Sequence, residues 1–186
     1  LAVVPDLFAP PSATELHALR DAVKAAVEQA IEAMATMCRR EGEALAAELG
    51  ARSALLRGLV NDVAQRAEGG PEVIRKRLTI KIDRLLAGGD LAVDVVRLET
   101  EVALLAERGD VTEELIRLGS HLDQFAEVVN SGTAEPVGRR LDFLLQEMLR
   151  EANTLGAKAQ DAGISQQVVA MKVELERLRE QVQNVE

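Results

Sequence analysis

Two glutamates one helical turn apart, Glu147 and Glu151, are the most unusual polar feature of this sequence. They lie in the segment 138–161, whose apolar residues recur at steps of three and four and predict one amphipathic helix. These apolar residues are Leu141, Leu144, Leu145, Met148, Ala152 and Leu155. Like charges at positions i and i+4 cost a helix roughly 0.2–0.5 kcal/mol unless a cation lies beside them. Arg150 or a metal ion could be that cation.

A second polar row, Glu114, Arg117 and His121, has spacings of three and four residues and falls along one shoulder of another predicted helix. The core of that helix is predicted to be Val111, Leu115, Leu118, Leu122, Phe125 and Val129. Asp110 is expected to cap the helix, with Glu113 completing a capping box. A histidine beside an apolar stripe is more often a surface or interface residue than a ligand or a base, so the row alone is weak evidence of chemistry.

A short connection, residues 130–136, separates these two helices and predicts that they pack antiparallel. Such packing would place His121 and either Glu147 or Glu151 in one groove, together with Arg117 and Arg150. The alternative interpretation is that the same charges form interhelical salt bridges and caps.

The rest of the chain predicts an all-α protein with a long N-terminal helical arm, which forms a helical hairpin, and a compact C-terminal helical bundle. Aromatic residues make up only 2% of the sequence, which is rich in Ala, Leu, Val, Glu and Arg, as helical bundles are. Gly69-Gly70-Pro71 interrupts the helical pattern and predicts the hairpin, and Gly42 allows a kink in the arm. Leu55, Leu59 and Val63 are expected on the apolar face before the break. The predicted boundaries are 1–11 for the tail of a missing domain, 12–90 for the arm and 91–186 for the C-terminal domain.

The composition also limits the partners. A formal net charge of −9 argues against holding nucleic acid by bulk electrostatics, so any nucleic-acid site must be local, metal-assisted or shared with another chain. The single cysteine, Cys38, excludes an intrachain disulfide and fits a reducing compartment. No apolar run approaches membrane-spanning length, and no signal peptide, glycine-rich phosphate loop, zinc spacing or nucleophile elbow is present.

Two further stretches leave alternatives open. The segment 72–86 carries Arg75, Lys76, Arg77, Lys81 and Arg84, which fit a solvated helix face or, less often, a wall that faces RNA. The last predicted helix has a seam of Ile164, Val168, Met171, Leu175, Leu178 and Val182, which serves packing or oligomerisation. Because the segments 16–44 and 164–182 are long and amphipathic, we expect an assembly of several chains.

Three stretches of sequence resemble the YicC (YloC) endoribonucleases of bacteria. They are EVALLAERGDVTEELIRLGSHLDQF (101–125), VGRRLDFLLQEMLREANTLGAKAQDAGIS (137–165) and LERLREQVQNVE (175–186), and RREGEAL (39–45) is a weaker match upstream. The resemblance covers most of residues 39–186. One departure is Leu149, which stands where the family usually carries Asn, so either contacts to RNA or contacts that support the site residues are expected to be weaker.

The resemblance implies metal-dependent cleavage of RNA by a cytoplasmic homo-oligomer, a hexamer in relatives, with no membrane and no DNA involved. It implies that Glu114, Glu147 and Glu151 bind Mg²⁺ or Mn²⁺, the ions that oxygen ligands suit. His121, Glu147 and Glu151 are the expected catalytic residues. The expected RNA-binding residues are Arg117, Arg139, Arg140, Arg150, Asn153 and Lys158.

A helical adaptor or RNA-binding scaffold without catalysis is the competing function. It would explain the acidic charge and the long apolar seams without any chemistry. A nuclease assay separates the two functions.

Overall fold

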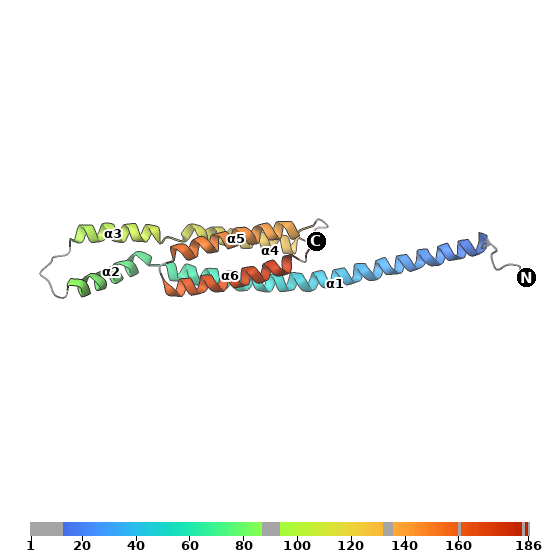
Figure 1. Ribbon diagram of the computed structural model, residues 1–186, viewed down its shortest axis with the longest axis horizontal. Coiled ribbons are helices and arrows are strands. Elements are labelled where there is room, and N and C mark those ends of the chain that lie inside the picture. The colour runs from blue at the N-terminus through green and yellow to red at the C-terminus, as the bar shows by residue number, and fades with distance from the viewer. Residues whose placement is uncertain (1–12, 87–93, 132–135, 160, 184, 186) are drawn as a thin grey trace, which may run out of the picture. The chain divides into compact units, whose positions relative to one another are not determined.

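The structure is a computed structural model that describes residues 13–86, 94–131, 136–159, 161–183 and 185. These residues form helices and no strand, as the all-α prediction required. The helices are α1 (Ala13–Ala67), α2 (Gly70–Leu86), α3 (Val95–Arg108), α4 (Thr112–Asn130), α5 (Gly138–Lys158) and α6 (Ala162–Val182) (Figure 1). The predicted tail, 1–11, lies outside the described residues, as does the predicted domain boundary at residue 90.

The chain divides into two compact units, Leu1–Leu45 and Ala46–Glu186. Helix α1 carries residues of both units and is continuous through Gly42. In the first unit its large apolar side chains are half or more exposed. They are Leu16, Leu19, Val23, Val27, Ile31, Met34 and Met37.

The glycine-proline break lies where the sequence predicted it, between α1 and α2. Gly69 has a φ of 80°, a left-handed conformation that glycine adopts without the steric cost of a Cβ. The hairpin predicted at this break is formed one element later, since α2 packs against α3 and an ion pair of 2.8 Å joins Arg75 on α2 to Glu99 on α3.

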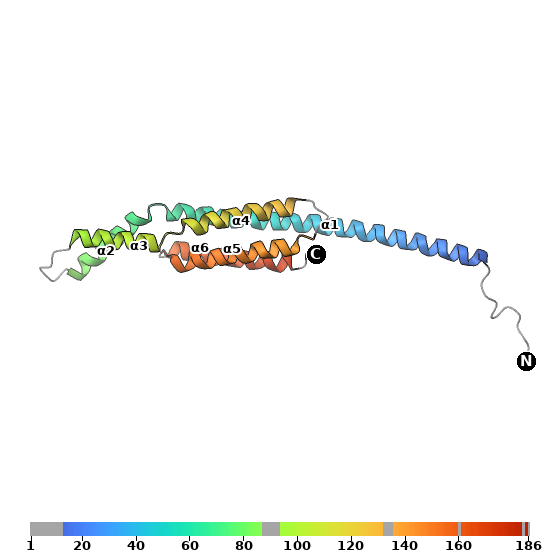
Figure 2. The same cartoon turned by 90° about the horizontal axis from the view of Figure 1, so that it is seen from above.

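The core of the second unit lies where α4, α5 and α6 pack together (Figure 2). Phe125 and Leu122 of α4 and Met148 of α5 are fully buried. The predicted apolar stripe of α5 is confirmed, since all six of its residues are buried. Residues of α1 join this core through Leu56 and Val63, both fully buried.

Some core residues differ from the prediction by one position. Leu55 is 54% exposed and its neighbour Leu56 is fully buried, so the predicted face of α1 was wrong at this turn. On α4 it is Val128 that is buried, while Val129 is only half-buried. In both places two adjacent apolar residues fit a helical period equally well, and packing against the neighbouring helices decides which one is buried.

The apolar seam of α6 is buried within this chain along its whole length. Of the two uses that the sequence left open, packing within the chain is therefore the one observed, and the expected assembly of several chains stays a prediction. Glu174, on the same helix, is only 8% exposed and pairs with Arg52 of α1 and Arg177 of α6. No helix among the described residues is long and apolar enough to cross a membrane.

Candidate functional site

Ion pairs join α4 to α5 and fix how the two helices run. Lys158 Nζ lies 2.8 Å from Glu114 Oε1, and Arg117 Nη1 lies 3.5 Å from Glu151 Oε1. Glu114 comes before Arg117 on α4, whereas its partner Lys158 comes after Glu151, the partner of Arg117, on α5. The helices are therefore antiparallel, as the short connection between them predicted.

Glu114 and Lys158 form the first of these pairs, at the start of α4 and the end of α5. Glu114 is only 4% exposed, so its charge is costly to bury unless a cation compensates it. The Lys158 ammonium also donates to the main-chain carbonyl of Asp110 at 3.1 Å. The hydrogen bond to Glu114, followed by the charges of neighbouring carboxylates, raises the pKa of Lys158 above its ordinary value. Glu114 Oε2 is buried and has no hydrogen-bond partner in the part of the chain that the structure describes.

The start of α4 differs from the predicted capping box. Val111 is the N-cap residue and no side chain caps from that position. Asp110 nevertheless accepts from the amide and the hydroxyl of Thr112, at 2.9 and 2.6 Å, and these bonds are the largest cause of its lowered pKa. Glu113 instead pairs with Arg117 at 3.1 Å. The spacing of four residues between Glu113 and Arg117 could have revealed this pair in the sequence.

Each of the two glutamates on α5 has its own cation. Arg150 lies 2.9 Å from Glu147, which confirms that Arg150 is one of the cations beside the glutamate pair. Arg117 reaches Glu151 from α4. Glu151 is 6% exposed, whereas the side chains of Arg117 and Arg150 are 56% and 72% exposed. The arginines therefore present charge to solvent above carboxylates that are largely covered.

His121 lies one turn beyond Arg117 on the same shoulder of α4. The antiparallel register that pairs Arg117 with Glu151 places His121 level with Glu147, one turn earlier on α5. The imidazole is half-buried, and its Nδ1 is buried without a hydrogen-bond partner among the described residues.

Other predicted RNA-binding residues lie away from this row. Arg139 and Arg140 are exposed in the first turn of α5, about 10–12 Å along the helix axis from Glu147 at 1.5 Å per residue. Asn153 is exposed on α5, and Leu149, at the position where the amide is missing, is half-buried. The structure thus brings together Arg117 and Glu151, and Arg150 and Glu147, but does not gather all of the predicted residues in one cleft.

The predicted metal ligands were Glu114, Glu147 and Glu151. Within the described ranges, no three His, Cys, Asp or Glu side chains lie close enough together to hold a metal ion. Each of the three carboxylates faces a lysine or an arginine instead. As it stands, this arrangement does not fit a metal held by these three residues of one chain.

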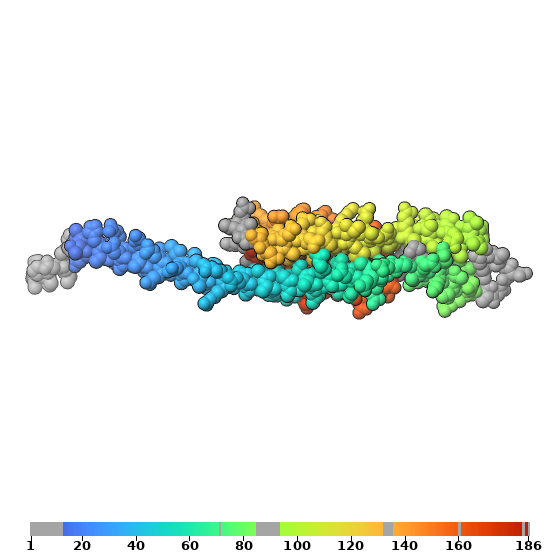
Figure 3. All heavy atoms as spheres, turned by 180° about the vertical axis from the view of Figure 1, so that it is seen from behind, coloured from blue at the N-terminus to red at the C-terminus, as the bar shows by residue number. Residues whose placement is uncertain are grey.

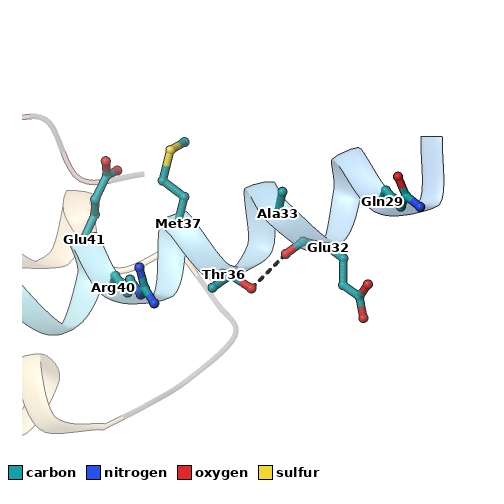
Figure 4. A pocket seen from close by; sticks show the side chains of 7 residues that line it. All are labelled: Gln29, Glu32, Ala33, Thr36, Met37, Arg40 and Glu41. Atoms are coloured by element: carbon teal, nitrogen blue, oxygen red, sulfur yellow. Dashed lines mark hydrogen bonds between the residues drawn. The ribbon is translucent and has the colours of Figure 1, made fainter. Parts of the chain in front are cut away.

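A shallow hollow on α1 offers no better site. Its lining comes from one helix only, residues 29–41, so the side chains do not enclose a cavity (Figure 4). Thr36 donates its hydroxyl to the main-chain carbonyl of Glu32 at 2.9 Å, a common bond within a helix.

Comparison with known proteins identifies the region that carries these rows. Residues 63–186 match the family described as "Endoribonuclease YicC-like, C-terminal". A protein of Clostridioides difficile (strain 630) named "Probable endoribonuclease YicC" is 37% identical over 161 residues, which are 87% of this chain and 54% of that protein. A protein of the same name from Haemophilus influenzae (strain ATCC 51907 / DSM 11121 / KW20 / Rd) is 47% identical over 96 residues, which are 52% of this chain and 33% of that relative.

The chain spans about half the length of the first of these relatives and a third of the second. The matched region contains α4, α5 and α6 completely, with both polar rows. The resemblance stated from the sequence is thereby confirmed, and the chain belongs to the family of YicC-like endoribonucleases.

Proposed function

We propose that this chain is part of an endoribonuclease that cleaves phosphodiester bonds within RNA. We also propose that Arg117 and His121 of α4, with Glu147, Arg150 and Glu151 of α5, contribute to its active site. We call these five residues the α4/α5 row. The observation that carries the proposal is the family match over residues 63–186, supported by two relatives named as probable endoribonucleases. The row of Arg117, His121, Glu147, Arg150 and Glu151 supplies the kinds of groups that such a reaction needs.

Arg117 and Arg150 are proposed to hold the phosphate at which the chain is cut. A guanidinium group presents several N–H donors in a fixed fork that matches phosphate oxygens. Both side chains are more than half exposed, so they can reach a phosphate without losing their contact to the carboxylates beneath them. Glu147 and Glu151 then keep the two arginines in place.

His121 is proposed to move the proton that cleavage requires. Breaking the phosphodiester needs a nucleophile to lose a proton and a leaving oxygen to gain one, and histidine is the side chain that most often does either. Because Nδ1 is buried, Nε2 is the ring nitrogen assigned to this exchange.

A divalent ion is a separate part of the proposal. Mg²⁺ or Mn²⁺ would stabilise charge on phosphate oxygens, and Glu147, the most exposed of the three glutamates, is the ligand that this chain could best offer. Such an ion would displace Arg150 or draw its other ligands from elsewhere. The roles given to Arg117 and His121 do not depend on the ion, and titration with a chelator tests its requirement.

The remaining predicted residues are given supporting roles. Arg139, Arg140 and Asn153 are exposed and are proposed to contact RNA beyond the cleaved bond. Lys158 is proposed to hold the start of α4 against the end of α5, because its ammonium group already binds Glu114 and the carbonyl of Asp110. It is thus a positioning residue in this scheme.

The proposal also covers how many copies of the chain assemble and in which compartment the protein acts. We propose a cytoplasmic homo-oligomer that acts on RNA and not on DNA, joined through the apolar residues of α1 that the first unit leaves exposed. Light scattering of the purified protein at micromolar concentration checks this, since a stable monomer would contradict it.

The test of the proposed function combines two measurements, the cleavage of RNA and the thermal stability of the protein. The complete protein and its Glu151→Gln variant are incubated with a structured RNA, and cleavage and melting temperature are measured for both. We expect the wild-type protein to cut RNA internally, and the variant to lose most of the cleavage rate while its melting temperature falls by less than about 3 °C, because glutamine keeps an acceptor for Arg117. RNA binding without cleavage by the wild-type protein would favour the scaffold function instead.

A further inference from the structure

Helix α2 carries a mixed basic face that the α4/α5 row does not use. At about 100° per residue, six side chains fall within about 140° of one another around the helix. These side chains are Val73, Lys76, Arg77, Ile80, Lys81 and Arg84. Val73 and Ile80 are 56% and 54% exposed, and the basic residues among them are exposed as well. We call this set the α2 basic face.

The opposite side of α2 explains why this face is turned outward. Ile74, Leu78 and Ile82 are half-buried. They lie on one side of the helix, and α2 packs against α3, which lies next to it in Figure 3. Arg75 points to that side too, where it pairs with Glu99. The apolar side of the helix and Arg75 are therefore engaged in the fold.

Three charges of the α2 basic face, those of Lys76, Lys81 and Arg84, are available to a partner. Along the parts of the chain that the structure describes, no ion pair forms to Lys76, Lys81 or Arg84. The helix has five basic and two acidic residues in a chain whose net charge is −9, so cations are concentrated here. A shallow hollow lies between Arg77, Ile80, Lys81 and Arg84.

A polyanion fits this face better than a membrane does. Helices that lie in a membrane surface separate a broad apolar side, often with Trp, Phe or Leu, from a basic side. Here the broad apolar side packs on α3, and the two exposed aliphatic residues are interleaved with the cations. Val73 and Ile80 can instead pack on ribose or base while the cations bind phosphates.

We propose that the α2 basic face is a second RNA-binding surface, which holds the phosphate backbone of the substrate away from the bond that is cut. The inference rests on the proposed function for the identity of its partner. RNA affinity is therefore expected to depend on this face, whereas the cleavage rate of bound RNA is not.

The test uses the complete protein with Lys76, Lys81 and Arg84 all changed to Gln. Each phosphate contact to single-stranded nucleic acid contributes about 0.7 to the slope of log affinity against log salt. Three contacts give a slope change of about 2, or about 100-fold in affinity near 0.1 M salt. Affinity for a labelled single-stranded RNA is measured across a salt series, together with the single-turnover cleavage rate at saturating RNA.

A matched control removes the same charge elsewhere. Lys24, Arg39 and Arg40, all exposed on α1, are changed to Gln in a second protein. A third protein keeps the charge of the α2 basic face with Lys76→Arg, Lys81→Arg and Arg84→Lys, and should bind as the wild type does.

An affinity loss at least tenfold larger than in the control, with cleavage at saturation unchanged, supports the proposal. A smaller difference, or binding of anionic phospholipid vesicles that depends on the face while RNA binding does not, overturns it. If the wild-type protein never cleaves RNA, the proposed function fails, but the affinity series still decides whether this face binds RNA.

Discussion

Removing the charge of Arg117 should destabilise the protein more than removing the charge of its partner Glu151. Glu151 is 6% exposed and lies 3.5 Å from Arg117, whose side chain is 56% exposed. Breaking a fully buried pair costs about 3–5 kcal/mol, and an exposed pair is worth about 0–1 kcal/mol. With one buried and one exposed partner, Arg117→Met should cost about 1–2 kcal/mol, because it leaves the carboxylate without its cation. Glu151→Gln should cost less than about 1 kcal/mol, since the amide oxygen still accepts a hydrogen bond.

Thermal unfolding followed by circular dichroism measures this difference. At about 2–4 °C per kcal/mol for a protein of this size, Arg117→Met should lower the melting temperature by about 2–8 °C. Adding Glu151→Gln to Arg117→Met should restore part of the loss, because the buried charge that lacked a cation is then gone. If Glu151→Gln alone costs as much as Arg117→Met, or the double variant is less stable than both, the carboxylate is not held by Arg117 and the reasoning fails.

Three further predictions concern the fold. Leu56→Ala should cost about 2–5 kcal/mol and Leu55→Ala less than about 0.5 kcal/mol in urea unfolding, because only Leu56 is buried; similar losses would contradict the observed face of α1. Gly138→Ala should destabilise the protein by about 1–3 kcal/mol, since the added Cβ would collide with the main-chain carbonyl oxygen of Val185; an unchanged melting temperature would refute that close approach. Asp110→Ala should cost about 1 kcal/mol at neutral pH. The pKa of Asp110 is lowered from 3.8, so this contribution is present above about pH 4 and is lost as the pH falls through the lowered pKa; a loss independent of pH would contradict it.

The sequence was sufficient for the helices but not always for their buried faces. The stripe on α5 could be predicted because Leu141, Leu145, Met148, Ala152 and Leu155 recur at steps of four and three residues. Leu55 and Leu56 are adjacent and equally apolar, so only contacts with neighbouring helices select Leu56. The seam of α6 shows the same limit, because a regular apolar repeat does not say whether its partner belongs to the same chain.

The packing of α4 on α5 could be predicted from the sequence, but the ion pairs between them could not. The short connection between α4 and α5 predicted an antiparallel pair and hence a meeting of the two polar rows. It could not show that Lys158 would bind Glu114, since that depends on the register between the helices. The presence of carboxylates likewise suggested a metal. Instead, the register between the helices brings a cation to Glu114 and to Glu151, and Arg150 of the same helix lies beside Glu147.

The central claim, that the α4/α5 row takes part in RNA cleavage, is tested most directly by the single-turnover cleavage rate of Glu147→Gln at saturating RNA. Glu176→Gln is the matched control, because Glu176 pairs with Arg179 three residues later on α6 as Glu147 pairs with Arg150 on α5. We predict a fall of at least about 100-fold for Glu147→Gln, as expected when a charged group at an active site is lost, and less than about twofold for the control. Equal cleavage rates for the two variants would contradict the claim.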